Sequence, residues 1–307
     1  MNILSDLSEK KESLEHTAAG TLDARTRLYC LLGSPVSHSI SPAMHNEAFR
    51  LLGLNCAYLA FDVDENTFER AVDGLITLNA GGWNCTMPLK RLMYERADEL
   101  SDSALLSGAV NTVVNRDGLL FGDNTDGYGF LKSMSEAGFD VPGRKLTLLG
   151  SGGAAAAILA QAALDGAAAI DVFARSTSAS TRLIEAEIGR IHGKCACRLS
   201  LYDLAASDQL KKSLAESQAL INASSVGMAP RADASLITDA SWLPPELFVG
   251  DVIYNPRETL LLKTAQKAGC RTFNGMYMLL HQGAKAFQDW TGMEMPVEAV
   301  RAKYFHE

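Results

Sequence analysis

A short apolar run that leads directly into a glycine-rich turn constrains the fold of this chain more than any other feature. The run is Lys145–Leu149, and the turn is Gly150-Ser151-Gly152-Gly153-Ala154-Ala155. An alanine-rich helical stretch follows, and a second apolar run occupies residues 169–173. A tight turn between a strand and a helix lets the backbone approach a pyrophosphate, whose charge is held by amide groups at the helix N-terminus. The pattern predicts a dinucleotide-binding domain of the Rossmann type, and the alternative is a turn that serves only helix packing.

The residues at the end of the second apolar run bear on which nucleotide fits. NAD enzymes usually carry Asp or Glu there, whereas the 2′-phosphate of NADP needs a cation and hydroxyl groups. This chain has Arg175, Ser176 and Thr177 in that place, and Asp171 lies too early in the strand. We therefore expect NADP, with NAD as the second choice. The alternative for Arg175 is an exposed arginine beside a polar loop.

The first part of the chain also alternates strands with helices. Strands are expected at 28–32 and 58–63, and helices at 42–52 and 68–78. A hairpin is expected within 112–122, inside a segment, 107–129, that we take as the domain junction. In the second part, further strands are expected at 219–222, 248–253 and 271–273. The fold class predicted is α/β, with two domains that each hold a mostly parallel sheet between helices.

Charge and composition exclude several classes of protein. The chain of 307 residues has 28 basic and 36 acidic residues and a net charge of −8, so we expect no nucleic-acid partner. Residues 1–25 are polar and lack the apolar core of a signal peptide, and no stretch supplies the roughly 20 apolar residues of a membrane span. A soluble cytoplasmic protein is expected. Cys195 and Cys197, near His192, have no second ligand pair for structural zinc, so no metal is expected.

Four polar clusters mark the first part of the chain. Ser39 and Ser41 stand two residues apart, and in an extended segment both hydroxyls would face one anionic ligand. Pro42 suits the first helical position, so Ser41 also resembles an N-cap, and a plain N-cap is the alternative. Taken alone, Lys90 would be a solvated lysine in the first turn of a helix. The remaining clusters are Gly108-Ala109-Val110-Asn111-Thr112 and Gly122-Asp123-Asn124-Thr125-Asp126-Gly127, the last of which would otherwise be a turn.

Taken together and in order, these clusters resemble the shikimate dehydrogenase family, including its quinate/shikimate branch. The segments that carry the resemblance are His38-Ser39-Ile40-Ser41-Pro42, Asn84-Cys85-Thr86-Met87-Pro88-Leu89-Lys90, the two clusters above and the Gly150 turn. The resemblance runs from about residue 29 to the C-terminus. It implies a discontinuous substrate-binding domain (26–126 and 276–307), a Rossmann domain (127–275) that binds NAD(P), and a polar extension (1–25) outside both.

The resemblance also implies a role for individual side chains. Lys90 would be the general acid/base, and Asp126 would be its partner. The implied substrate-binding residues are Ser39, Ser41, Thr86, Lys90, Asn111, Asp126, Tyr254 and Gln282. The implied and inferred cofactor-binding residues are Gly150, Ser151, Gly152, Gly153, Ala154, Ala155, Arg175, Ser176, Thr177, Val252 and Gly275.

The reaction that this resemblance implies is reversible hydride transfer between NAD(P) and shikimate/3-dehydroshikimate, or quinate/3-dehydroquinate. Lys90 and Asp126 would serve the oxygen on which negative charge develops. Ala174 and Ala179 depart from the NADP-using branch, which has an asparagine and a second basic residue there. The alternatives are a dehydrogenase for another cyclic polyol or amino-shikimate, or a ligand-binding homologue without turnover. The oligomeric state, monomer or homodimer, stays open.

Overall fold

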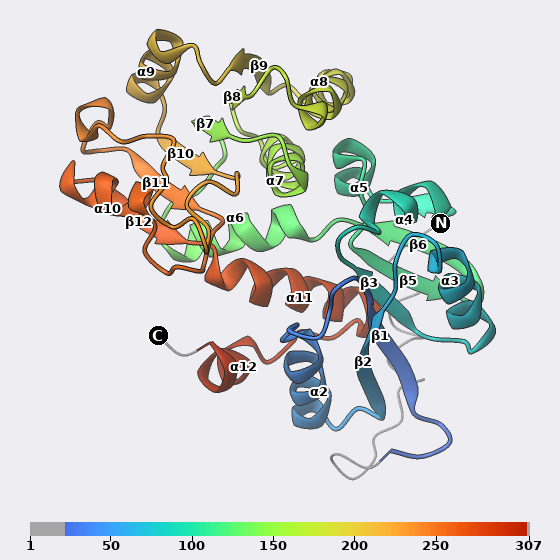
Figure 1. Cartoon of the computed structure of the whole chain (residues 1–307). Helices are drawn as coiled ribbons and strands as arrows, with labels where there is room; N and C mark the ends of the chain where they lie inside the picture. The colour runs from blue at the N-terminus through green and yellow to red at the C-terminus, as the bar shows by residue number, and fades with distance from the viewer. Residues whose placement is uncertain (1–21, 306–307) are drawn as a thin grey trace. The chain divides into compact units, whose positions relative to one another are not determined.

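The architecture is taken from a computed structural model, which describes residues 22–305. Contacts divide the chain into two compact units, shown in Figure 1. The first unit holds the chain up to Thr125 and again from Leu280 onward, and the second is Asp126–Leu279. Most of the polar extension predicted over residues 1–25 lies outside the described residues.

The first unit is built on a mixed six-stranded sheet in the order β2-β1-β3-β5-β6-β4. Strand β1 pairs in parallel with β2 and β3, whereas β5 is antiparallel to both β3 and β6. The strands are β1 (Arg27–Gly33), β2 (Cys56–Asp62), β3 (Gly82–Cys85), β4 (Glu99–Leu100), β5 (Thr112–Arg116) and β6 (Leu119–Asp123). The predicted hairpin is β5 and β6, and it is built into this sheet; the chain enters the second unit only after Thr125.

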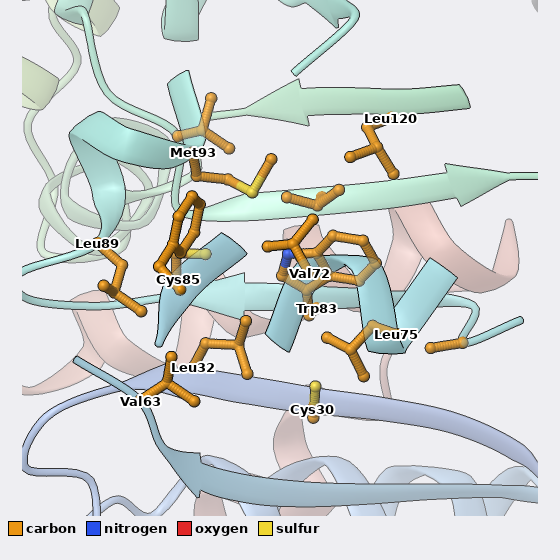
Figure 2. Close-up of a cluster of buried hydrophobic side chains, with 14 of the residues drawn as sticks. Cys30, Leu32, Val63, Val72, Leu75, Trp83, Cys85, Leu89, Met93 and Leu120 are labelled. Carbon is orange, nitrogen blue, oxygen red and sulfur yellow. The ribbon is translucent and has the colours of Figure 1, made fainter. Parts of the chain in front are cut away.

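Helices of the first unit follow the apolar periodicity of the sequence. They are α2 (Ser41–Leu52), α3 (Phe68–Thr77), α4 (Lys90–Arg96), α5 (Asp102–Ser107) and α12 (Val297–Tyr304), together with most of α11 (Met276–Thr291). Figure 2 shows the core on one side of this sheet, where Trp83 of β3 lies among Val72 and Leu75 of α3 and Met93 of α4. Burial of these side chains against β1 and β3 fixes the sheet that carries the predicted substrate residues.

The second unit is a six-stranded, fully parallel sheet in the order β12-β11-β10-β7-β8-β9. Its strands are β7 (Lys145–Leu149), β8 (Ala169–Ala174), β9 (Arg198–Asp203), β10 (Ala219–Asn222), β11 (Phe248–Asp251) and β12 (Arg271–Asn274). Its helices are α6 (Asp126–Glu136), α7 (Gly153–Leu164), α8 (Ala179–His192), α9 (Ser207–Glu216) and α10 (Leu260–Lys267), with a 3₁₀ turn, η1, at Ala240–Trp242.

The strand order of the second unit reverses between β7 and β10, as in doubly wound folds that bind ligands at the carboxyl ends of their strands. The predicted strands at 145–149, 169–173, 219–222 and 271–273 are present within one residue at each end. Strand β9 was not predicted, because it lies at the sheet edge, is half-exposed and lacks a continuous apolar run. Within residues 22–305, no helix is long and apolar enough to cross a membrane.

Candidate active site

A buried hydrogen-bond network fixes Asn111 where β3 ends and β5 begins. The Asn111 carbonyl oxygen accepts hydrogen bonds from the Cys85 amide at 2.9 Å and from the Asn84 Nδ2 at 3.0 Å. Its side-chain Oδ1 accepts the Thr125 amide at 2.9 Å. Asn111 is 2% exposed, so these bonds form away from water and hold the side chain in one orientation.

The network continues to the edge strand of the sheet. The Tyr58 hydroxyl of β2 donates to Asn84 Oδ1 at 2.7 Å, and Asn84 Nδ2 also donates to Thr112 Oγ1 at 3.0 Å. Complete burial raises the pKa of Tyr58 well above its ordinary value, so the hydroxyl keeps its proton and acts as the donor. Because Thr112 donates to Asn111 at 3.0 Å, Tyr58 is connected to Asn111 through two buried side chains.

Thr86 and Lys90 lie at the same end of the sheet as Asn111. Thr86 follows β3, and its amide donates to the Leu32 carbonyl of β1 at 2.9 Å. Lys90 is the first residue of α4 and is half-buried. Its backbone carbonyl accepts a hydrogen bond of 2.9 Å from the Val110 amide. Burial raises the pKa of the Cys85 thiol to about 12, and the nearby positive charge of Lys90 acts in the opposite direction. The lysine side chain thus lies within electrostatic reach of the end of β3.

Ser39 and Ser41 differ from the predicted geometry. The segment before α2 is a turn rather than an extended strand, because the Ser39 amide donates to the Val36 carbonyl at 3.0 Å. The N-cap is Ile40, with φ −81° and ψ −12°, so the prediction of Ser41 as N-cap was wrong. Ser41 instead opens the helix, and its amide donates to Ser39 Oγ at 3.2 Å. The binding of one anionic ligand by both hydroxyls stays a prediction.

Gln282 lies on α11, which packs against the first sheet and α2. The Trp290 indole of this helix donates to the Val113 carbonyl of β5 at 2.9 Å. Gly283 lies directly beneath Met44 of α2, and a β-carbon there would come within 2.2 Å of the Met44 methyl. Gln282 is 8% exposed, and it belongs to the first unit, as do Asn111 and Thr86.

Asp126 is the first residue of α6 and is 9% exposed. It directly follows Thr125, which belongs to the network around Asn111 in the first unit. Lys90 belongs to the first unit and Asp126 to the second, so their pairing stays a prediction.

The glycine-rich turn lies between β7 and α7, as predicted, and it lines a cavity of about 290 Å³. Gly150 has φ +117°, and a β-carbon there would lie 2.9 Å from the Ala223 carbonyl oxygen, so only glycine fits without strain. Gly152 is the N-cap of α7, and no side chain caps it. The first amides of α7 are therefore available to an anionic ligand, which is the chemistry a pyrophosphate needs.

The cavity is completed by the segments that follow β8 and β10, the two strands on either side of β7. Its lining brings Gly150 and Ser151 together with Arg175, which follows β8, and with the loop after β10. The residues of that loop in the lining are Ser224, Ser225, Val226, Gly227, Arg231, Ala234 and Leu236. Small and hydroxyl side chains beside a guanidinium suit an adenosine phosphate. Gly152, Gly153, Ala154, Ala155, Ser176 and Thr177 do not line the cavity.

A carboxylate that the sequence did not suggest lies next to the end of β8. Asp203, the last residue of β9, pairs in register with Ala174, and its side chain accepts the Ser176 amide at 3.1 Å. Hydrogen bonds from Ser176 and the Ala205 amide lower the pKa of Asp203, so the group is negatively charged. Asp171, by contrast, forms an ion pair with Lys145 at 2.9 Å inside the sheet and does not reach the end of the strand.

Tyr254, Val252 and Gly275 belong to the carboxyl ends of β11 and β12. Asp251, fully buried, accepts hydrogen bonds from Asn222 at 3.0 Å and from the Ile253 amide at 3.0 Å, which fixes the loop that follows β11. A β-carbon at Gly275 would lie 2.3 Å from the Val252 carbonyl oxygen, so the two segments touch through their backbones. Tyr254 is 55% exposed and available to a ligand.

The six cysteines are free thiols, and Cys197 is buried. Among the described residues, no three His, Cys, Asp or Glu side chains come together as ligands for a metal ion.

Two family models match parts of this chain. Residues 31–113 match the model of the shikimate dehydrogenase substrate binding domain, and residues 275–303 match that of the shikimate 5'-dehydrogenase C-terminal domain. Shikimate dehydrogenase (NADP(+)) from Listeria monocytogenes serotype 4b is 45% identical over 284 residues, which cover 92% of this chain and 97% of that protein.

Solved structures give the same result. The crystal structure of shikimate 5-dehydrogenase from Listeria monocytogenes in complex with shikimate and NAD has a TM-score of 0.88 at 45% identity, covering 92% of this chain and 97% of that one. Quinate dehydrogenase from Corynebacterium glutamicum in complex with NAD has a TM-score of 0.80 at 29% identity, covering 91% of this chain and 99% of that one. The expected two-domain α/β fold is confirmed, and the chain belongs to the shikimate dehydrogenase family.

Proposed function

We propose that this chain catalyses the reversible, NADP-dependent oxidation of shikimate to 3-dehydroshikimate. The observation that carries the proposal is the 45% identity to the Listeria monocytogenes shikimate dehydrogenase (NADP(+)) over 92% of this chain. The buried network around Asn111 and the cavity beside Gly150 support it, because one offers fixed polar groups to a polyhydroxy acid and the other offers amides to a dinucleotide.

The residues of the second unit fit the dinucleotide. The residues that would hold it are Gly150 and Ser151 at the pyrophosphate, Arg175 at the adenosine, and Val252 and Gly275 at the nicotinamide. When bound, NADP accepts a hydride at its nicotinamide ring, which is the redox chemistry that protein side chains lack.

Lys90 is the proposed general acid/base. Removal of hydride from a carbinol carbon requires that the hydroxyl proton leave, and negative charge develops on the oxygen in the transition state. In the direction of oxidation the neutral amine accepts the hydroxyl proton, and in the direction of reduction the ammonium group donates it back. In both directions the positive charge on the nitrogen stabilises the oxygen in the transition state. Asp126 is the proposed partner that orients Lys90 and accepts a hydrogen bond from the substrate.

The remaining predicted side chains bind the ring and its carboxylate. Thr86, Asn111 and Gln282 would meet ring hydroxyls, and Asn111 is suited to this by the fixed orientation of its amide. Ser39 and Ser41 would bind the substrate carboxylate, and Tyr254 would contact the substrate from the second unit.

Quinate is the second candidate substrate, and the likeness to the quinate dehydrogenase of Corynebacterium glutamicum favours it. An absorbance assay at 340 nm that crosses shikimate and quinate with NADP and NAD tests both candidates. We expect the highest kcat/KM for shikimate with NADP. No turnover with any of the four pairs would refute the proposal and favour a ligand-binding homologue. The cytoplasmic location stays a prediction from the sequence.

The role of Lys90 is tested by Lys90→Ala. We expect kcat to fall by on the order of 10²-fold or more, because a proton-transfer group is lost. Arg91→Ala is the matched control, since Arg91 is the next residue of α4, is exposed and forms an ion pair with Glu95 at 3.3 Å. A Lys90→Ala enzyme that keeps kcat within tenfold of the wild type would refute the assignment.

A further inference from the structure

The cavity beside the glycine-rich turn has two charged residues in its lining, and both are arginines. Arg175 follows β8, and Arg231 stands in the loop after β10. The other lining residues are neutral, among them Ser151, Ser224 and Ser225. Within residues 22–305, neither guanidinium forms an ion pair or a side-chain hydrogen bond with another residue.

Arg231 is brought to the cavity by a loop that is tied to the strand ends. Asn222, at the end of β10, accepts the Ser224 amide at 3.1 Å, and the Ala229 amide donates to the Asn255 carbonyl at 3.2 Å. The Arg231 amide donates to the Met228 carbonyl at 3.0 Å, which closes a turn directly before the arginine. The side chain therefore starts from a defined backbone rather than from an unanchored loop.

The charge at the end of β8 explains why a second cation is needed. A phosphate monoester carries a charge of about −1.5 to −2 at neutral pH. The loop after β8 supplies one cation, Arg175, but the charged carboxylate of Asp203 already accepts the Ser176 amide. Arg175 alone would balance only part of the negative charge of a phosphate that lies beside that carboxylate. Two unpaired guanidinium groups in one cavity repel each other, and a dianion between them would remove this cost.

We propose that Arg231 is the second cation for the adenosine 2′-phosphate of NADP, and that it sets the preference of this chain for NADP over NAD. The inference deepens the proposed function, because it takes the cavity to be the adenosine end of the NADP site. It assigns a specificity-determining role to a side chain on the loop after β10, away from the β8 end where such residues are usually sought.

Binding of nucleotide fragments tests the proposal without turnover. The probes are adenosine 2′,5′-bisphosphate and ADP, titrated calorimetrically into the wild type, Arg231→Ala and Arg231→Lys. Loss of a charge-assisted contact should weaken the bisphosphate about tenfold or more in Arg231→Ala, with ADP changed by less than about threefold. Arg231→Lys should keep part of the affinity, since it keeps the charge but not the bidentate geometry.

Arg198→Ala is the control, because Arg198 is an exposed arginine at the opposite end of β9 and does not line the cavity. Its affinities should equal those of the wild type. Equal losses for both nucleotides in Arg231→Ala would place the side chain at the adenine or the 5′-phosphate and overturn the proposal. Unchanged affinities would overturn it as well. Because these titrations need no shikimate, a wrong substrate assignment would leave the outcome intact and would show only in the 340 nm assay.

Discussion

His45 gives the sharpest link between the fold and a measurable pH dependence. This residue of α2 is fully buried, and its ring stacks on Tyr58 at a centroid distance of 4.4 Å and lies 5.2 Å from that of Trp290. Neither ring nitrogen has a hydrogen-bond partner in the part of the chain that the structure describes. Burial therefore lowers the pKa of His45 to about 3, and the imidazole is neutral in the folded protein.

The sign and size of the effect follow from proton linkage. In the unfolded chain the pKa of a histidine is about 6.5, so on acidification the unfolded state binds the proton first. The folded pKa is depressed, and stability is lost as the pH falls from about 6.5 toward 3. At pH 5 the titration of His45 lowers the free energy of unfolding by about 2 kcal/mol relative to pH 7.5, where its effect is close to zero.

The assay is urea unfolding of the wild type and His45→Phe at pH 7.5 and pH 5.0. Phenylalanine keeps an aromatic ring in the stack and removes the titrating nitrogens. Asp251 and Asp289, whose pKa values burial raises to about 6, are present in both proteins, so their effects cancel in the comparison. The stability of His45→Phe relative to the wild type should rise by about 2 kcal/mol between pH 7.5 and 5.0.

The wild type is the control at each pH, because the two proteins share every titrating group except His45. The reasoning is refuted if the wild-type and His45→Phe stabilities fall in parallel between the two pH values. A pKa for His45 above 6, measured by NMR in the folded protein, would refute it independently.

Two further predictions concern the predicted binding residues and the network behind them. In Gly275→Ala the new methyl would collide with the Val252 carbonyl oxygen at 2.3 Å, so we expect a loss of about 1–3 kcal/mol in thermal unfolding and weaker NADPH binding by fluorescence titration. Gly189→Ala, in α8 with open space around it, should be neutral or stabilising, and a Gly275→Ala protein that behaves the same way would contradict the reasoning. Tyr58→Phe leaves Asn84 Oδ1 without its donor and should cost about 1–3 kcal/mol in urea unfolding while raising the KM for shikimate; an unchanged stability would show that the bond contributes nothing.

Strands β7, β8, β10 and β11 of the second unit could be predicted because each is a buried run rich in apolar residues. The glycine-rich turn was located for a related reason, since Gly150 needs a backbone conformation that few other residues adopt. Strand β9 lacks both signals, because an edge strand has one exposed side and needs no apolar residues there. The carboxylate of Asp203 at its end was missed with it.

Site prediction in the first unit depended on short motifs whose residues interact locally or across adjacent strands. Thr86 and Lys90 flank one turn, and Asn111 directly precedes β5, the strand that pairs with β3, so the structure holds these three at one end of the sheet. The turn before α2 was predicted wrongly, because the two-residue spacing of Ser39 and Ser41 fits an extended segment and a turn equally well. Spacing alone does not distinguish these, whereas the hydrogen bond from the Ser39 amide does.

The loop after β10 shows what kind of information the sequence lacked. Its hydroxyl side chains and Arg231 carry no motif, and nothing in their spacing points to a ligand. What places them at the cavity is the strand order, since β10 lies directly beside β7, whose end carries the glycine-rich turn. In a parallel sheet the loops after neighbouring strands meet at one edge, so knowledge of that single neighbour relation would have made the loop a predicted part of the cofactor site. Long-range strand order is set by packing of the whole unit rather than by any short segment, and for that reason Ser224 and Arg231 could be found only from the structure.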